Sequence, residues 1–197
     1  MTICPTALTV VGDADLANDR LGLCVAVSLT LSDAMTSFLH EEIDLAIRFG
    51  TPTDGALNAR RLAGNRRVLC AAPAYVDSRG APATPEDLRG HECLGFAYGT
   101  TRHRWSFAGP DGVVMVEVSC RHVVNNGQAL LTLALAGMGI VLQPASLVRD
   151  DLSSGRLVHL LPDHEPPTHP MHILYAPDRR ITPKLQSFID FAVGRLG

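Results

Sequence analysis

No apolar run in this sequence approaches the roughly 18 residues that a membrane-spanning helix requires, which excludes a transmembrane protein. The first residues hold no Lys or Arg before Arg20 and no compact apolar run, so they do not predict a signal peptide, and we expect a cytoplasmic protein. Positive charge is scarce as well. The net charge is −3, whereas phosphate binding needs a concentrated basic surface. The chain by itself is therefore not expected to hold DNA.

Cysteine pairs and catalytic signatures are also absent. The five cysteines, at positions 4, 24, 70, 93 and 120, are widely spaced and never form Cys-x-x-Cys. Three of them sit in apolar runs, which favours buried thiols in a reducing compartment over a disulfide framework. The sequence has no Gly-x-Ser-x-Gly, no Walker glycines and no His-Glu-x-x-His. These absences argue against an enzyme, and we expect no cofactor.

Four histidines in the last quarter of the chain raise the question of a metal site. They are His159, His164, His169 and His172. Their spacing follows no structural zinc pattern, and the proline-rich stretch 162–170 would hold them apart as an extended loop. The pattern is typical of a solvated loop, and no metal is expected.

The residues that are present alternate between strand and helix patterns. Apolar runs predict strands at 7–11, 22–31, 43–48, 66–72, 93–96, 105–107, 113–118, 121–124, 140–143 and 171–175. Helices are predicted at 34–40, 73–80, 128–136, 144–151 and 183–196, with a capped turn at 84–88 and a hairpin turn at 109–112. Such alternation indicates an α/β fold. For the strand, helix and strand over 121–143, parallel strands are the default.

Ten short segments of the chain stand in a fixed order. They are IDLAIRFG at 43–50, RRL at 60–62, VLCAAPAY at 68–75, TPEDL at 84–88, HECL at 91–94, NNG at 125–127, ALAGMGI at 134–140, DL at 151–152, GRLV at 155–158 and SFIDF at 187–191. Together these segments resemble the effector-binding domain of LysR-type transcriptional regulators. Ordered matches over most of a chain are far more specific than one short motif.

The resemblance implies a fold of two Rossmann-like α/β lobes around a hinged cleft, like the type 2 periplasmic binding proteins. Lobe one is expected to comprise residues 1–80 and 160–197, and lobe two residues 81–159. Family members carry an N-terminal winged helix-turn-helix and a linker helix, and this sequence supplies neither. Residues 1–20 are short for the family's first strand and first helix, so an abbreviated first lobe is expected.

The same resemblance implies partners and a mode of action. An anionic or aromatic small molecule would bind between the lobes, and the protein would form a homodimer or tetramer through lobe one, near residues 25–30. DNA would be bound only through the winged helix-turn-helix that is absent here, and no membrane is involved. Two alternatives stay open: an exported solute-binding protein of the same architecture, and a truncated regulator that acts only as an oligomerisation partner.

Asn125, Asn126 and Gly127 immediately precede the helix predicted at 128–136. Free N–H groups and partial positive charge at a helix N-terminus suit the carboxylate of an effector, and an Asn amide adds a donor. The competing interpretation is that one Asn caps the helix and Gly127 relaxes the turn.

Arg48, Phe49 and Gly50 lie at the end of a predicted strand, where ligand crevices open in α/β sheets. Arg48 would pair with an anionic effector through two parallel hydrogen bonds. Alternatively it holds a structural carboxylate such as Asp44 or Glu42. The sequence does not decide between these two roles.

Two further groups complete the predicted effector site. Ser32 and Asp33 stand at another strand-to-helix turn, where helix capping explains them equally well. Tyr98, Gly99 and Thr100 stand at the expected entrance of lobe two, where an aromatic ring beside a hydroxyl suits an aromatic or short acidic ligand. A plain surface loop is the alternative for these three residues.

Overall fold

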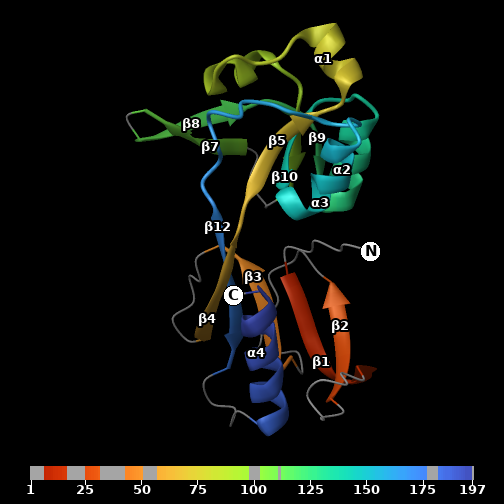
Figure 1. Ribbon diagram of the computed structural model, residues 1–197, viewed down its shortest axis with the longest axis vertical. Coiled ribbons are helices and arrows are strands. Elements are labelled where there is room, and N and C mark those ends of the chain that lie inside the picture. Colours follow the sequence, from red (N-terminus) through yellow and green to blue (C-terminus); the bar gives the residue numbers. More distant parts are fainter. Residues whose placement is uncertain are drawn as a thin grey trace. The chain divides into compact units, whose positions relative to one another are not determined.

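The computed structural model describes residues 7–16, 25–31, 43–50, 57–97, 103–110, 112–176 and 182–196. These residues form two compact units (Figure 1). Unit one spans residues 65–168, and unit two takes the described residues before 65 and after 168. The chain thus enters unit one at residue 65 and leaves it at residue 168, with a sheet in each unit.

The boundaries between the units lie at residues 65 and 168. The predicted boundaries were near residues 80 and 160. Strand β5 (Arg67–Ala71), which precedes residue 80, belongs to unit one because it pairs antiparallel with β10 (Ile140–Pro144) and β11 (Val158–His159). Beyond residue 160, the Ala108 N–H donates a hydrogen bond to the Glu165 carbonyl, which keeps that loop in unit one. Proline and glycine near residue 80 mark the turns around a helix, and long-range pairing sets the boundary.

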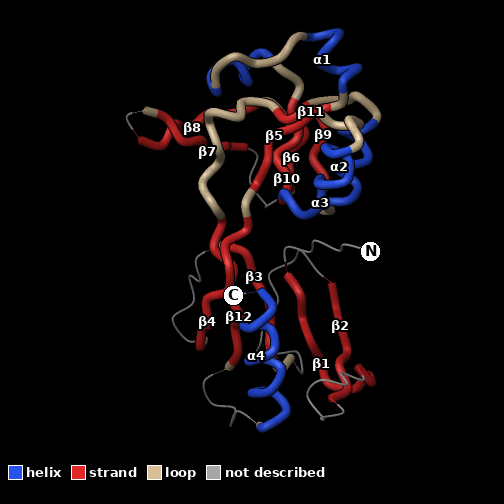
Figure 2. The backbone as a smooth tube through the Cα atoms, viewed as in Figure 1, coloured by secondary structure: helices blue, strands red, loops and turns tan. Residues whose placement is uncertain are grey.

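The main sheet of unit one has the strand order β11-β5-β10-β6-β9 (Figure 2). Strand β6 (Cys93–Phe96) runs parallel to both of its neighbours, β10 and β9 (Cys120–Val124). The predicted strand, helix and strand are therefore present and parallel, joined by α2 (Gly127–Leu135). However, β6 lies between β9 and β10, so the two strands joined by α2 do not pair with each other.

Alternation along β5 supplies both faces of this sheet with apolar side chains. Leu69 and Ala71 point to the face covered by α1 (Pro73–Arg79), the 3-10 turn η1 (Pro85–Gly90) and the hairpin β7 (His103–Gly109) and β8 (Gly112–Val118). Val68 and Cys70 point to the face covered by α2 and α3 (Ala145–Ser153). Unit one is therefore a three-layer structure with a core on each side of its sheet. Its larger core contains Leu69, Ala71, Tyr75, Leu88, Cys93, Trp105, Phe107, Val116, Val118, Ile140, Leu160 and Leu161.

Unit two is a five-stranded sheet with one described helix packed on it. The strand order is β2 (Val25–Leu31), β1 (Ala7–Leu16), β3 (Leu45–Phe49), β12 (His169–Tyr175) and β4 (Asn58–Asn65). Helix α4 (Pro183–Leu196) buries the face predicted from its 3.6-residue period, which Leu185, Phe188, Ile189 and Ala192 form. That face packs against Leu45, Ile47, Leu62 and Ile173. In the described part of the chain, no helix is long and apolar enough to cross a membrane.

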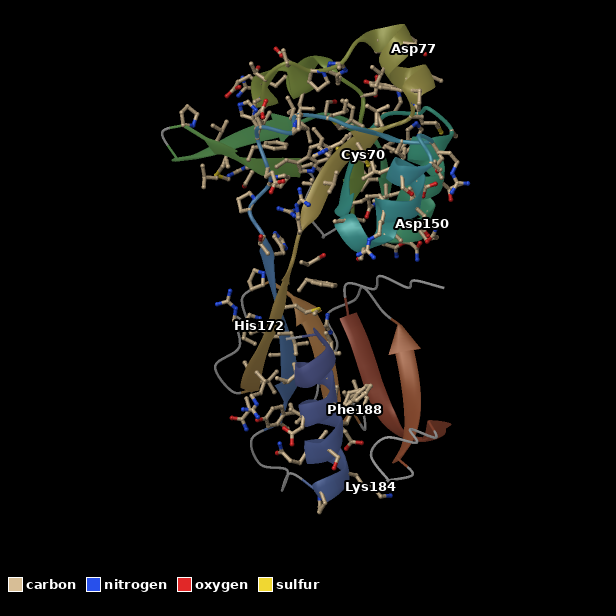
Figure 3. The ribbon with its side chains drawn as sticks, in the orientation of Figure 1. Cys70, Asp77, Asp150, His172, Lys184 and Phe188 are labelled. Atoms are coloured by element: carbon tan, nitrogen blue, oxygen red, sulfur yellow. The ribbon has the colours of Figure 1, made fainter. Side chains whose placement is uncertain are left out.

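The cysteines of unit one are free thiols, as expected for Cys70, Cys93 and Cys120. Cys70 and Cys93 are buried, and Cys120 is half-buried (Figure 3 labels Cys70). Burial raises the pKa of Cys120 to about 11. Burial, with a smaller contribution from the Asp151 charge, raises the pKa of Cys70 to about 12. Burial also raises the pKa of Cys93.

We therefore expect iodoacetamide at pH 8 to modify these thiols very slowly in the folded protein. A shift of the Cys120 pKa from 9.0 to about 11 lowers its thiolate fraction at this pH by about 100-fold, and the thiolate is the reactive form. Cys70 and Cys93 should react only after denaturation. Peptide mapping by mass spectrometry measures each site separately, and rapid native labelling of Cys70 would contradict the expectation.

Candidate functional site

The carboxyl ends of β6, β9 and β10 meet at one edge of the sheet in unit one, because these three strands are parallel. Asn125 follows β9, and Gln143 lies next to the last residue of β10. The Ala97 N–H, just after β6, donates to the Val124 carbonyl over 3.1 Å and joins the ends of β6 and β9. Ligands of open α/β sheets bind outside the carboxyl ends of the strands. We call this the carboxyl edge of unit one.

Asn126 is the N-cap of α2, whereas one of the two sequence interpretations predicted a cap by one Asn without saying which. Its backbone is extended, with φ −140° and ψ 122°, and its side-chain Oδ1 accepts a hydrogen bond from the Ala129 N–H over 2.9 Å. The Asn126 carbonyl accepts the Leu130 N–H over 3.1 Å. The side-chain oxygen of Asn126 is therefore used in capping. The amide NH₂ takes no part in the cap, and the residue is exposed.

The first turn of α2 retains two backbone donors. The N–H groups of Gly127 and Gln128 donate to no acceptor in the described part of the chain. Unpaired N–H groups and the positive end of the helix dipole make such a turn suitable for an anion. The turn lies at the carboxyl edge, where the fold also favours a ligand.

Gln143 is the residue of this edge that the sequence interpretation did not single out. Its side chain is 3% exposed, and its Nε2 donates to the Gly127 carbonyl over 3.2 Å. The available signal was a polar residue directly after the apolar run 140–142, inside a predicted strand. The contact fixes the first turn of α2 to the end of β10, so the donors of that turn are held in place.

Arg48, Phe49 and Gly50 lie in unit two, at the carboxyl end of β3 as predicted. Arg48 stands opposite His172 of β12 in the sheet register, and Phe49 opposite Met171. Gly50 has φ +101°, which favours glycine, and its N–H donates to the Pro170 carbonyl over 2.8 Å.

His172, on the neighbouring strand β12, contacts the main chain at the end of β3 (Figure 3 labels His172). Its Nδ1 lies 2.9 Å from the Gly50 carbonyl, and Nδ1 must be the donor because a carbonyl only accepts. The histidine stands within β12, which includes the strand predicted at 171–175. The main chain at Gly50 is thus held by β12 at two points.

Five predicted site residues lie outside the described residues: Ser32, Asp33, Tyr98, Gly99 and Thr100. Their roles stay predictions. Among the residues that are described, no group of three His, Cys, Asp or Glu side chains is placed to hold a metal ion. The described candidates therefore comprise Asn125, Asn126 and Gly127 in unit one and Arg48, Phe49 and Gly50 in unit two.

Comparison with known proteins places this geometry in a family. The CrgA regulator of Neisseria meningitidis serogroup B is 32% identical over 174 residues, which cover 88% of this chain and 58% of that protein. PtxR of Pseudomonas aeruginosa is 31% identical over 173 residues, which cover 88% of this chain and 55% of that regulator. Both are HTH-type transcriptional regulators. The chain spans little more than half the length of these relatives.

Solved structures agree with the sequence matches. The CrgA regulatory domain superposes with a TM-score of 0.69 at 34% identity, covering 79% of this chain and 76% of that domain. The full-length Vibrio cholerae activator AphB gives a TM-score of 0.72 at 25% identity, covering 85% of this chain and 57% of AphB. The fold is therefore the two-lobed, type 2 periplasmic-binding-like α/β fold that was predicted. The family model described as the LysR substrate binding domain matches residues 15–197, and the chain belongs to that family.

Proposed function

We propose that this chain senses a small anionic effector on behalf of a LysR-type transcriptional regulator. The observation that carries the proposal is the first turn of α2 at the carboxyl edge of unit one. There the N–H groups of Gly127 and Gln128 have no acceptor in the described residues, and Asn126 and Gln143 hold the turn in place. A preformed pair of donors binds a carboxylate without reorganising the protein.

Sensing requires that the effector bind one arrangement of the protein more tightly than another, so that the population shifts. In our proposal the effector biases a homodimer or tetramer formed through unit two, where β2 is the edge strand of the described sheet. DNA would be bound by a winged helix-turn-helix of the regulator in the cytoplasm. The monomer mass is 21.1 kDa, so sedimentation equilibrium showing only that mass would count against the assembly.

The related proteins are transcriptional regulators, and we accordingly propose no reaction for this chain. They do not favour an exported solute-binding protein. Ser32, Asp33, Tyr98, Gly99, Thr100 and Asn125 stay proposed effector contacts, as do Arg48, Phe49 and Gly50. Arg48→Ala tests the contribution of unit two, since loss of its guanidinium should weaken binding of an anion.

The sharpest test replaces Asn126 with aspartate. The carboxylate still accepts the Ala129 N–H and suits the helix dipole, so the melting temperature should change little. It also places a negative charge beside the proposed anion site, and binding of a carboxylate effector should weaken at least about tenfold, equivalent to roughly 1.4 kcal/mol. A thermal-shift screen of small carboxylates, aromatics and amino acids supplies the ligand, and calorimetric titration measures the affinity.

Asn126→Ser is the matched control, because serine caps the helix without adding charge. It should keep both the stability and most of the affinity. Asn126→Ala removes the cap and should cost about 1 kcal/mol of stability. Equal affinities of the aspartate and serine variants for a carboxylate ligand would show that the anion binds elsewhere.

A further inference from the structure

Asn126 is the only asparagine of this sequence that is followed by a glycine. In an Asn-Gly pair the backbone nitrogen of the glycine can attack the side-chain amide of the asparagine, because glycine has no Cβ to obstruct the approach. Asn126 is also exposed, so water and hydroxide reach it. The pair has the chemistry for spontaneous deamidation, and the surrounding turn decides whether the reaction proceeds in the folded protein.

The reaction passes through a cyclic imide. Hydroxide removes the proton of the Gly127 nitrogen, which forms a bond to Asn126 Cγ. The Cγ–Nδ2 bond then breaks, and the leaving nitrogen takes up a proton from water and departs as ammonia, which returns the hydroxide. Water opens the imide ring at Cγ to give aspartate, or at the main-chain carbonyl carbon to give isoaspartate. In sum, an amide and a water become a carboxylate and an ammonium ion, and nothing is oxidised or reduced.

The hydrogen bonds of the turn assist the attack on Cγ. The Gly127 N–H donates to no acceptor in the described part of the chain, so its nitrogen is not engaged in the helix. The Ala129 N–H donates to Asn126 Oδ1 over 2.9 Å, and this oxygen takes up the negative charge when Cγ is attacked. Nδ2, the atom that leaves, takes no part in the cap. The turn therefore supplies a donor to the developing oxyanion and leaves the departing group exposed.

The conformation of the turn opposes ring closure. The imide ring contains the bond between Cα and the carbonyl carbon of Asn126, so it requires a ψ far from the 122° of the capped residue. Two hydrogen bonds resist that rotation. The Asn126 carbonyl accepts the Leu130 N–H over 3.1 Å, and the Gly127 carbonyl accepts Gln143 Nε2 over 3.2 Å. Gln143 is 3% exposed and belongs to β10, so it holds an exposed turn to the buried sheet. The turn must open locally before the ring forms.

We propose that Asn126 is a site of spontaneous deamidation in the folded protein, and that Gln143 sets its rate by holding the first turn of α2. The two products differ in their effect. Aspartate keeps the capping oxygen and adds a negative charge, as Asn126→Asp does. Isoaspartate inserts a methylene group into the main chain and so removes the cap. The modification needs no effector, and it is therefore independent of the proposed function.

Peptide mapping by mass spectrometry, on folded wild-type protein kept in mildly alkaline buffer, measures the conversion of each asparagine. Asn126 should convert at least about tenfold faster than Asn58 and Asn65, which corresponds to about 1.4 kcal/mol in activation free energy. Those two residues precede Ala59 and Arg66, whose side chains obstruct the attack. Aspartate and isoaspartate, separated by chromatography, should both form at position 126. Conversion of Asn126 no faster than that of Asn58 and Asn65 would overturn the proposal.

Gln143→Leu tests the restraint on the turn. Asn126 should convert about fivefold faster in this variant, the factor that corresponds to one hydrogen bond. Gln143→Met is a second variant of similar length, should the leucine variant fold poorly. Phe107→Ala is the control, because it weakens the core on the other face of the sheet and leaves the turn intact, so its rate should match wild type. An unchanged rate in both Gln143 variants, or equal acceleration in Phe107→Ala, would overturn the role of Gln143.

Discussion

Replacing Phe107 with alanine is expected to lower the free energy of unfolding of unit one by about 3–5 kcal/mol. The Phe107 side chain is fully buried in the core between the main sheet and the hairpin of β7 and β8. Truncation removes its transfer free energy and leaves a cavity that the surrounding side chains fill only in part. Trp105, the sole tryptophan, is 8% exposed in the same core, so its fluorescence in a urea titration follows this unit.

The same hairpin provides the controls for this prediction. Val113 and Met115 on its outer face are 64% and 57% exposed. Their replacement by alanine should change the free energy of unfolding by no more than about 0.5 kcal/mol. A Phe107→Ala variant as stable as these controls would show that the hairpin does not pack on the sheet in solution.

Gly139→Ala is expected to cost about 1–3 kcal/mol, the range for overpacking, although it adds a single methyl group. A Cβ at this position would lie 2.6 Å from the Glu92 carbonyl oxygen and 3.3 Å from Leu94 Cγ. The Glu92 carbonyl is fixed because it accepts the Ile140 N–H over 2.9 Å, at the start of the pairing between β6 and β10. The added methyl group must therefore push these two strands apart.

Gly90→Ala is the matched control for Gly139→Ala. A Cβ at Gly90, at the end of η1, would meet no atom within 4 Å, and its φ is not positive. The free energy of unfolding should change by no more than about 0.5 kcal/mol. Tryptophan fluorescence during denaturation reports both variants, since both glycines lie in unit one. Equal stabilities would mean that the two strands are not held as closely as described.

Local sequence determined most of the elements and indicated that an asparagine would cap α2. The period of α4, the capped turn at Thr84 and the hairpin turn between β7 and β8 were predicted from residues within one element. Asn126 also caps α2 through its near neighbour Ala129, three residues away. Such features depend on bonds between residues close in sequence, so a pattern of residue types is enough to predict them.

Strand β4 shows where local pattern fails. It was not predicted as a strand, because its residues other than Leu62 are mostly polar or small, and Leu62 is the one buried residue among the β4 side chains that the structure describes. It is a strand because it lies beside β12, more than 100 residues later in the chain. Hydrogen bonds to a strand far away in the sequence satisfy the backbone N–H and C=O groups of β4, although its own side chains form no pattern that predicts a strand.

The sequence by itself therefore determined the family, the α/β alternation and the candidate turn at Asn125, Asn126 and Gly127. Only the tertiary structure decided that β6 lies between β9 and β10, and that Gln143 reaches the first turn of α2. It also decided which residues share a unit with the predicted ones: Gln143 with the predicted Asn126, and His172 with the predicted Arg48. The physical reason is that strand order and buried hydrogen bonds join residues far apart in the chain, which no local period records.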